Sequence, residues 1–316
     1  MPQSMKFKHT LSLVTCVYGV EEYIEQYAHS IFSQTYTDIE YIFVNDGTKD
    51  NSIQILERVI DEYYAHLRSN IIILNQINQG LPLARKSGIS LAKGDYILFA
   101  DPDDWLSPNA VEEILTKADE TDADIIYFNL VKEYGHRQSL KREKHYTAET
   151  KELWIENIFN YKSFGYCVTK CFRRSLYTDN TIYTPILGMH EDIYLMSQII
   201  FYAKSIVQMP KVLYHYRKTN KDSMCSQSSS TRHIASSRNL LNLYQNYMQD
   251  IANSPIRRVA NGILFRAGWH ALLHGYNFTK EYPWFVDAIR QAQMSTRYQA
   301  TLPQQMLVKV AAKISP

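Results

Sequence analysis

Three carboxylates within four residues are the strongest chemical signal in this chain. Asp101, Asp103 and Asp104 follow the apolar run Tyr96–Ala100, which has the composition of a buried strand. Carboxylates this close repel one another unless a cation joins them, and Mg2+ and Mn2+ prefer oxygen ligands, usually one or two carboxylates together with substrate phosphates. The pattern predicts a site for a metal-bridged phosphate compound; the alternative is an acidic turn ahead of a capped helix.

A second acidic pair, Glu191 and Asp192, opens a segment whose apolar residues Ile193, Met196 and Ile199 recur at helical spacing. The dipole and the free amides at a helix N-terminus stabilise an ionised carboxylate, which keeps it available as a base. Acidic first turns are also common in helices that have no catalytic role. The residues alone therefore leave both interpretations open.

Single residues near the ends of expected strands could recognise a nucleotide. Asp46 follows the run Ile39–Val44, where its carboxylate could accept a hydrogen bond from the N3–H of a uracil ring. It could equally form a turn with Gly47. Cys16 and Tyr18, at the end of the first expected strand, would line the same base pocket, although Tyr18 also suits a core position.

Arg85 lies on a helix that we expect from about Leu81 to Ala92. A guanidinium at this place could pair with phosphates or with Asp46, because its planar fork matches both kinds of anion. The alternative is a position on a solvent-exposed helix face.

The elements that must position these residues alternate between strands and helices over the first 105 residues. Apolar runs typical of buried strands are separated by segments with helical periodicity, and this order predicts a parallel sheet with right-handed crossovers. The expected strands cover Leu11–Val17, Ile39–Val44, Ile71–Leu74 and Tyr96–Ala100. Further on we expect a helix over Pro108–Ala118, a strand over Asp124–Asn129, a charged loop or hairpin over Lys132–Lys144, and helices from about Thr231 onward.

This order predicts one α/β domain followed by a helical region. The domain would cover residues 1–230, with a nucleotide-binding half at about 1–105 and an acceptor half at 106–230, and the helical region would cover 231–316. A chain of 316 residues is long enough for such a core.

Composition excludes several classes of function. The net charge of +2, from 34 basic and 32 acidic residues, lacks the positive excess of a dedicated nucleic-acid binder. The four cysteines form no paired CxxC set, so we expect reduced thiols in the cytoplasm rather than a zinc site. We expect no signal peptide, and no apolar run approaches the length of a membrane span.

The chain contains, in order, the stretches LVTCVYGVEEYIEQYAHSIFSQTYTDIEYIFVNDGTKDNS, NQGLPLARKSGISLAKGDYILFADPDDW, TKCFRRSLY and HEDIYL. Together they resemble the family 2 glycosyltransferases of the GT-A fold, the bacterial enzymes that build capsules, O-antigens and other surface glycans. The resemblance covers about residues 9–225. The second stretch is similar to the NxGxxxARNxG and DxD patterns of that family.

The resemblance implies a fold and a set of site residues. The fold is α/β of the GT-A type, a Rossmann-like nucleotide-diphospho-sugar transferase, with a mainly parallel central sheet flanked by helices and a helical C-terminal extension. Asp103 would bind Mn2+ or Mg2+, with Asp101 holding the ribose or a metal-bound water and Asp104 as a further ligand. Asp192 would be the catalytic base, and Glu191 would orient or bind the acceptor.

The resemblance also implies contacts on the donor side. Arg217 and, after it, His215 would contact the diphosphate, and Lys170 would approach the acceptor or a phosphate unless it is a surface lysine. The sequence departs from the family pattern at four positions, none of which removes a charge that the chemistry needs: Cys16, Gly19, Asn45 and Lys86.

The implied reaction is the inverting transfer of a hexose or N-acetylhexosamine from a UDP-sugar to a hydroxyl of a glycan or lipid-linked glycan, in capsule, O-antigen or exopolysaccharide synthesis. The protein would be cytoplasmic and peripheral on the inner face of the membrane. The amphipathic segment Leu302–Ile314 would lie in that interface or pack on its own domain, and subunits could pair as a homodimer. A sugar nucleotidyltransferase and a non-catalytic carbohydrate- or nucleotide-binding protein remain as alternatives.

Overall fold

A computed structural model describes residues 7–142, 151–159, 163, 165–185, 191–220, 230–251, 264, 266–268, 273 and 281–288. The chain forms two compact units. The first comprises Met1–His145, Tyr166–Ile186 and Gln198–Ser223, and the second comprises Tyr146–Gly165, Leu187–Ser197 and Met224–Pro316. The second unit therefore includes three stretches from within the range predicted as one domain, the last of them residues 224–230, and the predicted boundaries at 105 and 230 stay predictions.

Four parallel strands form one half of the sheet in the first unit, in the order β3-β2-β1-β4. They are β1 (Leu11–Val17), β2 (Ile39–Asn45), β3 (Ile71–Asn75) and β4 (Tyr96–Phe99), and they match the expected strands closely. The connecting helices are α1 (Ile24–Phe32), α2 (Ser52–Tyr63) and α3 (Leu81–Leu91), with a short 3-10 helix, η1 (Ala65–Asn70), before β3.

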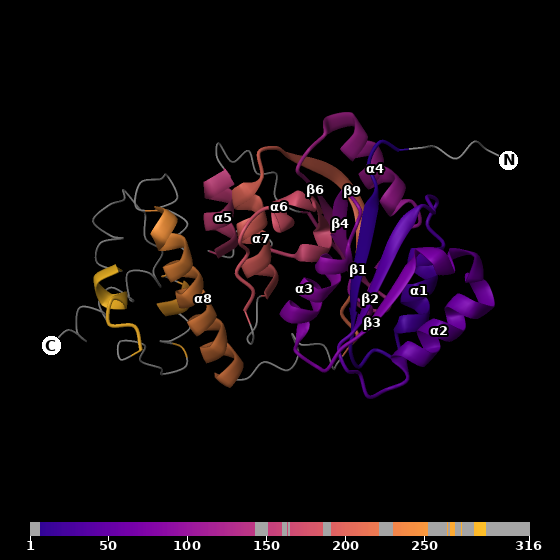
Figure 1. The fold of residues 1–316 in the computed structure, drawn as a ribbon, viewed down its shortest axis with the longest axis horizontal. Coiled ribbons are helices and arrows are strands. Elements are labelled where there is room, and N and C mark those ends of the chain that lie inside the picture. The colour runs from indigo at the N-terminus through magenta and orange to yellow at the C-terminus, as the bar shows by residue number, and fades with distance from the viewer. Residues whose placement is uncertain are drawn as a thin grey trace. The chain divides into compact units, whose positions relative to one another are not determined.

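The path of the chain reverses after β3, because β4 lies beside β1 on the side opposite to β2. Right-handed crossovers then require α3 on the other face of the sheet from α1 and α2, and this arrangement is visible in Figure 1. The predicted α/β architecture with helices on both faces is confirmed.

The other half of the sheet mixes strand directions and continues in the order β8-β6-β9-β5, with β7 paired to β6. Its strands are β5 (Trp105–Leu106), β6 (Ile125–Glu133), β7 (Gln138–Lys141), β8 (Lys170–Arg173) and β9 (Ile206–Arg217). The segments between them include α4 (Ala110–Thr121), η2 (Cys167–Thr169) and α6 (Ser175–Thr178). β8 runs antiparallel to β4 and β6, whereas β6 and β9 are parallel. The charged stretch after residue 131 is the predicted hairpin, formed by β6 and β7.

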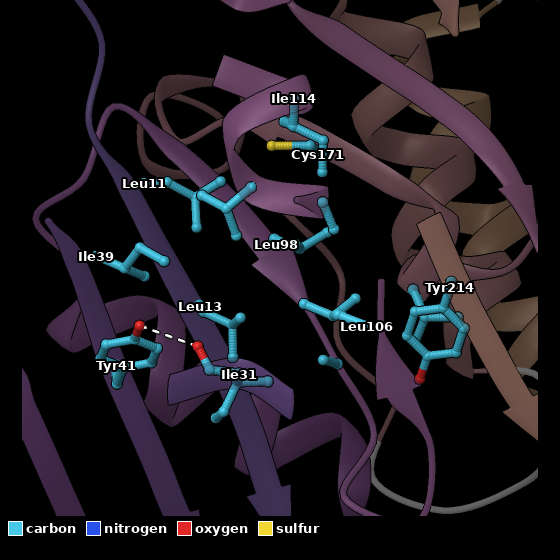
Figure 2. Packing of buried hydrophobic residues seen from close by; sticks show 14 of the residues in the cluster. Leu11, Leu13, Ile31, Ile39, Tyr41, Leu98, Leu106, Ile114, Cys171 and Tyr214 are labelled. Atoms are coloured by element: carbon cyan, nitrogen blue, oxygen red, sulfur yellow. Dashed lines mark hydrogen bonds between the residues drawn. The ribbon is translucent and has the colours of Figure 1, made fainter. Parts of the chain in front are cut away.

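The core of the first unit lies between the sheet and its helices. Leu13 of β1, Leu98 of β4 and Tyr214 of β9 are fully buried in one cluster (Figure 2). The hydroxyl of Tyr41 donates to the backbone carbonyl of Ile31 over 3.1 Å, so this buried phenol has a partner. Each fully buried side chain of this size stabilises the fold by about 1.5–3 kcal/mol.

The second unit is helical where the structure describes it. It contains α5 (Lys151–Phe159), the start of α7 (Glu191–Tyr202) and α8 (Ser230–Ile251). The buried hydroxyl of Tyr194 donates to the carbonyl of Ser236 over 2.6 Å and so joins α7 to α8. α8 agrees with the expected helical region, whereas Leu302–Ile314 lies outside the described residues. None of the described helices has the length and apolar composition needed to cross a membrane.

Candidate functional site

Several of the predicted site residues meet at one edge of the sheet. Parallel strands end on the same side, so the residues after β1, β2 and β4 are neighbours. We call this place the carboxyl edge: residues 16–18 at the end of β1, residues 45–47 at the end of β2 and residues 101–104 after β4. The backbone N–H of Asp46 donates to the carbonyl of Val17 over 3.1 Å, which joins the first two of these segments.

Residues 101–104 form a turn, here called the acidic turn, in which the N–H of Asp104 donates to the carbonyl of Asp101 over 3.1 Å. The Asp104 side chain is buried. Its Oδ2 accepts from the hydroxyl of Tyr214 and its Oδ1 from the backbone N–H of Arg217, both over 2.7 Å. The Tyr214 hydroxyl in turn accepts from the N–H of Asp101 over 3.1 Å. Asp104 therefore holds the turn against β9, and its burial leaves it less accessible to a metal ion than Asp103; its predicted role as a metal ligand stays a prediction.

The other two carboxylates of the acidic turn are more open. Asp103 is partly exposed and its Oδ2 accepts from the amide of Asn220 over 2.8 Å, while Oδ1 of Asp101 lies 3.3 Å from the Arg85 guanidinium. Burial and the charge of Asp101 raise the pKa of Asp103. Burial together with the charges of Asp103 and Asp101 raises the pKa of Asp104 well above its usual range.

Burial is the largest cause of both raised pKa values and the neighbouring carboxylates are the next, so an added positive charge would favour the ionised forms of Asp103 and Asp104. A divalent cation beside Asp103 and Asp101 would supply such a charge, so the donor set fits a hard metal ion. In the described part of the chain, no group of three or more His, Cys, Asp or Glu side chains forms a ready-made metal cage. A site of this type depends on substrate phosphates for its remaining ligands.

Arg85 is buried rather than placed on an exposed helix face, so that alternative is wrong. Its guanidinium pairs with Asp101 and not with Asp46. It also lies 5.3 Å from the centre of the Phe99 ring and 3.9 Å from the sulfur of Cys167. α3 therefore brings one cation to the acidic turn from the face opposite to α1.

Asp46 organises the loop between β3 and α3. Its Oδ1 accepts from the side-chain amide of Gln76 over 2.7 Å and from the N–H of Gln79 over 2.9 Å, and its Oδ2 accepts from the N–H of Gly80 over 2.8 Å. Gly47 has a φ of +67°, and a Cβ there would lie 2.8 Å from the backbone nitrogen of Asn78. The loop packs too closely for any other residue. Recognition of a base by Asp46 stays a prediction.

The end of β9 carries the two predicted diphosphate contacts. Nε of Arg217 donates to the carbonyl of Asp103 over 2.7 Å, and its Nη2 donates to the side chain of Gln26. The guanidinium lies 5.0 Å from the centre of the Tyr23 ring and 4.9 Å from that of Trp105. Arg217 thus joins α1, β9 and the acidic turn.

His215 lies next to this group and stacks on Trp105, with ring centres 5.2 Å apart. Its Nδ1 is 2.8 Å from Glu133 and its Nε2 is 3.2 Å from the hydroxyl of Ser107. With both ring nitrogens engaged, His215 positions Trp105 against the cation of Arg217. Its predicted contact with a diphosphate stays a prediction.

Three other predicted residues have distinct surroundings. Lys170 is fully buried, so the surface alternative is wrong; its Nζ donates to the carbonyl of Tyr166 over 3.1 Å. Tyr18 is 53% exposed and does not belong to the core, which leaves its ring accessible at the carboxyl edge. Cys16, the third of them, is partly buried at the end of β1.

Glu191 and Asp192 are the first two residues of α7, as predicted. They belong to the second unit. Oδ1 of Asp192 accepts from the N–H of Ile193 over 2.8 Å, an arrangement available at a helix N-terminus. Their catalytic roles stay predictions.

Sequence reasoning missed the residues that hold the site together. These are chiefly Tyr23, Trp105, Glu133, Tyr214 and Asn220. Trp105 directly follows the acidic turn and Asn220 comes three residues after Arg217, so proximity in sequence was an available signal for these two. For Tyr23 and Glu133 no such signal exists, because sheet pairing and loop packing bring them to the site.

The fold and the site define a class: an open α/β protein with neighbouring carboxylates, one buried arginine and one partly buried arginine at the carboxyl edge of its sheet, where open α/β folds bind their ligands. A family model described as glycosyl transferase family 2 matches residues 12–180. The chain belongs to this family, which confirms the prediction from the four sequence stretches.

Relatives in sequence carry related names. EpsH of Bacillus subtilis, named as a glycosyltransferase, is 34% identical over 214 residues, which are 66% of this chain and 60% of EpsH. The minor teichoic acid biosynthesis protein GgaB of the same species is 27% identical over 259 residues, covering 78% of this chain and 28% of GgaB. The chain thus spans about 60% or less of the length of these relatives.

Solved structures agree on the fold. A crystal structure of S. aureus TarS in complex with UDP-GlcNAc is similar with a TM-score of 0.69 and 21% identity, covering 90% of this chain and 80% of that one. The mannosyltransferase PcManGT of Pyrobaculum calidifontis, solved with GDP-Man and Mn2+, gives a TM-score of 0.57 at 12% identity, covering 98% of this chain and 81% of that one. The predicted GT-A fold is confirmed.

Proposed function

We propose that this protein transfers a hexose or N-acetylhexosamine from a UDP-sugar to a hydroxyl of a glycan acceptor in the synthesis of a cell-surface polysaccharide. One arrangement carries the proposal: the partly exposed Asp101 and Asp103 lie in one turn at the carboxyl edge, where Arg85 pairs with Asp101 and Arg217 donates to the backbone carbonyl of Asp103. Such a pair suits a metal-bound diphosphate. Because the chain belongs to a glycosyltransferase family, we expect this diphosphate to be part of a sugar nucleotide.

The preference for a uridine donor rests on Asp46. Three donors from the loop after β3 fix its carboxylate in one orientation, and a carboxylate has about four acceptor positions, so it retains room for one more N–H. Cys16 and Tyr18 complete the base side. The UDP-GlcNAc complex of TarS supports this choice, and the GDP-Man complex of PcManGT shows that the same fold also accepts a purine donor.

In this proposal Asp103, assisted by Asp101, holds Mn2+ or Mg2+, and Asp104 is a positioning residue that fixes the turn through Tyr214. When bound, the metal stabilises the negative charge of the departing nucleoside diphosphate. Arg217 keeps the acidic turn against α1, and His215 keeps Trp105 in place.

The acceptor side depends on α7 and β8. Asp192 takes the proton from the acceptor hydroxyl, Glu191 orients the acceptor, and the resulting oxygen attacks the anomeric carbon, with inversion. Lys170 is buried and its Nζ donates to the carbonyl of Tyr166, so its role is to brace η2 near the acceptor or a phosphate rather than to reach out from the surface. The acceptor is a glycan or a lipid-linked glycan at the cytoplasmic face of the membrane, and a homodimer is compatible with it.

The decisive experiment combines turnover and binding. The full chain is incubated with a panel of UDP-sugars and Mn2+, and release of UDP is measured with and without glycan acceptors. Asp192→Asn should lower transfer by about 10²–10⁴-fold, the usual contribution of a general base, and leave donor affinity unchanged. Tight donor binding without turnover for any donor and acceptor would contradict the proposal and favour a non-catalytic binding protein.

A further inference from the structure

The hairpin of β6 and β7 carries a concentration of positive charge that the proposed reaction does not use. We call residues 131–142 the basic hairpin. It contains four cations, Lys132, Arg137, Lys141 and Arg142, and one acid, Glu133. Glu133 is buried and faces His215 over 2.8 Å, so it does not screen the hairpin surface. The whole chain carries only +2, which makes this local excess a feature of the hairpin.

Apolar side chains are exposed among these cations. Tyr134 is 39% exposed and Leu140 is 45% exposed, although Leu140 pairs directly with the buried Val131 across the hairpin. The Arg137 guanidinium lies 5.1 Å from the centre of the Tyr134 ring, and both Arg137 and Arg142 are exposed. In the described sheet, β7 pairs with β6 alone, so this surface lies at an open edge.

We propose that the basic hairpin docks on the anionic surface of a phospholipid membrane. Lysine and arginine side chains bind anionic headgroups, while an exposed leucine and a tyrosine ring enter the boundary between headgroups and acyl chains. A soluble phosphate or a polyanionic glycan would satisfy the cations but would leave Leu140 in water. The mixture of cations with exposed apolar side chains therefore favours a lipid surface.

The basic hairpin is joined directly to the residues of the donor side. The backbone N–H of Lys218 donates to the carbonyl of Glu133 over 2.8 Å, and Glu133 lies opposite Arg217 in the pairing of β6 with β9. Docking would hold the carboxyl edge close to the headgroups. Its use in the reaction rests on the proposed function, because a lipid-linked acceptor presents its hydroxyl near the membrane surface.

Vesicle binding by the full-length protein tests this inference without any requirement for turnover. Co-sedimentation is measured with vesicles of phosphatidylcholine alone and of phosphatidylcholine mixed with phosphatidylglycerol. The charge variant is Arg137→Glu with Arg142→Glu, and the apolar variant is Tyr134→Ser with Leu140→Ser. The matched control is Arg68→Glu with Lys93→Glu, which makes the same charge change at two exposed residues that precede β3 and β4 at the other end of the strands.

The wild-type protein and the matched control should bind the anionic vesicles and leave the neutral ones. The charge variant should lose at least about tenfold in partition coefficient, because each basic residue near an anionic surface contributes about a factor of five. The apolar variant should lose several-fold while keeping its charge, and thermal melting should show both variants folded. All of these variants leave the carboxyl edge unchanged, so loss of binding with unchanged UDP release separates this inference from the proposed function.

Three results would overturn the inference. Absence of wild-type binding to anionic vesicles is the first. Equal binding by the charge variant and the matched control is the second, since it would move the membrane contact to another part of the chain. The third is retention of the wild-type protein, but not of the charge variant, by immobilised polyphosphate without any vesicle binding, which would assign the basic hairpin to a soluble polyanion.

Discussion

The two ends of the strands both carry clusters of acids, and they differ in how those acids are neutralised. At the carboxyl edge, Asp103 and Asp104 have raised pKa values. At the opposite end, which we call the amino edge (residues 8–10, 95–96, 119–124 and 173), Asp95 and Asp122 have lowered pKa values. The comparison separates an acid cluster whose ionised forms are stabilised by hydrogen bonds and cations of the chain from one whose ionised forms are disfavoured by burial and by neighbouring carboxylates.

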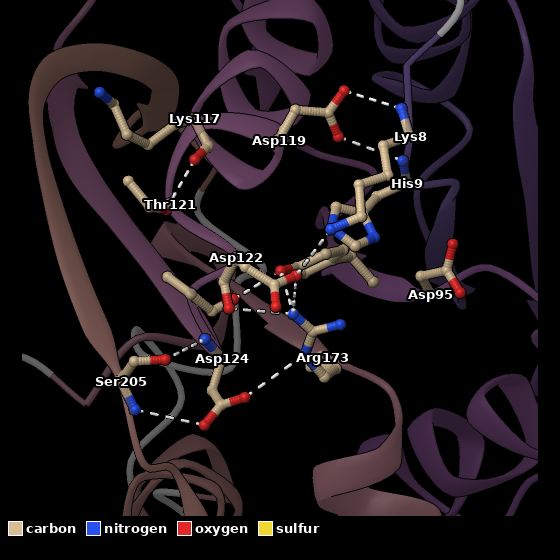
Figure 3. Close-up of polar contacts among 12 residues, drawn as sticks. Lys8, His9, Asp95, Lys117, Asp119, Thr121, Asp122, Asp124, Arg173 and Ser205 are labelled. Atoms are coloured by element: carbon tan, nitrogen blue, oxygen red, sulfur yellow. Dashed lines mark hydrogen bonds and ion pairs between the residues drawn. The ribbon is translucent and has the colours of Figure 1, made fainter.

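The amino edge is centred on Arg173 (Figure 3). Its guanidinium donates to Oδ1 of Asp122 and to the hydroxyl of Tyr96, each over 3.0 Å, and pairs with Asp124 over 3.3 Å. The hydrogen bond from Arg173, its charge and that of Lys8 lower the pKa of Asp122. Here the carboxylates are balanced by cations and amides of the chain itself.

The carboxyl edge has arginines too, but they serve other partners. Nε of Arg217 donates to a backbone carbonyl and its Nη2 to Gln26, while Arg85 pairs with Asp101 over 3.3 Å. Ionising carboxylates that are buried and close to one another costs free energy unless a cation joins them. To judge whether an acidic motif could bind a cation, the partners of its carboxylates are therefore more informative than the number of carboxylates.

The largest effect expected from this comparison is on turnover. Asp103→Asn should lower UDP release by at least about a hundredfold, because a bound metal contributes several kcal/mol of charge stabilisation. The matched control is Asp122→Asn at the amino edge, where asparagine tolerates the positive φ of 50°. UDP release at saturating donor and Mn2+ measures both. Retained activity in the Asp103 variant, or equal loss in the control, would remove the distinction between the edges.

Replacement of the buried cation should have the next largest effect. Arg85→Lys keeps the charge but loses the planar fork that reaches Asp101 and lies over Phe99, so kcat/KM should fall by about tenfold. Its exposed neighbour provides the control, since Lys86→Ala removes a charge that points to solvent. Steady-state kinetics with one UDP-sugar compare the two. An equal effect at both positions would mean that charge alone matters on α3.

At the amino edge the expected effect is on stability instead. Arg173→Leu removes hydrogen bonds to Tyr96 and Asp122, and the free energy of unfolding should fall by about 1–2 kcal/mol after allowance for solvent screening. Urea titration followed by circular dichroism measures this change. Turnover per folded molecule should stay at the wild-type level, and a specific loss of turnover would show that the amino edge takes part in the reaction.

The smallest expected effect is on how the free energy of unfolding depends on pH. Burial would raise the pKa of Asp95, but hydrogen bonds from Thr10 and the charges of His9 and Arg173 outweigh it and lower the pKa. A depressed pKa adds stability above the ordinary value of 3.8, and this stability is lost as the pH falls through the depressed pKa. Asp95→Asn should therefore be less stable than the wild type near neutral pH.

That difference in stability should narrow as the pH falls below the ordinary pKa of Asp95. Urea titrations of both proteins over a range of acidic pH values measure it. A difference that does not change with pH would show that Asp95 acts through its shape rather than its charge. At the carboxyl edge the sign is opposite, because the raised pKa of Asp104 opposes folding as the pH rises through it.

The sequence was sufficient for the parts of the fold that depend on local pattern. β1 to β4 and their helices follow from apolar runs and helical periodicity, and the acidic turn follows from three carboxylates after a buried strand. The short β8, which places Lys170 in the interior, has no such pattern, since its direction depends on pairing with β4 and β6.

For the site, the sequence predicted chemical types better than partners. Arg85 was expected near phosphates or Asp46, and its pairing with Asp101 depends on how α3 crosses the sheet. The two rings beside the guanidinium of Arg217 come from positions 23 and 105, far from it in the chain. Contacts of this range result from packing, which local patterns do not encode.

The anchoring of the acidic turn by β9 has a consequence for biosynthesis. The ribosome synthesises the chain from the N-terminus to the C-terminus. Residues 101–104 therefore emerge more than 100 residues before Tyr214 and Arg217, which hold them in place. Until β9 has been synthesised, the nascent chain contains β1 to β4 and the acidic turn but lacks the contacts from β9 that hold this turn. Premature termination ahead of β9 would thus release a fragment that contains every acidic group attributed to metal binding but lacks the residues that fix the turn carrying them.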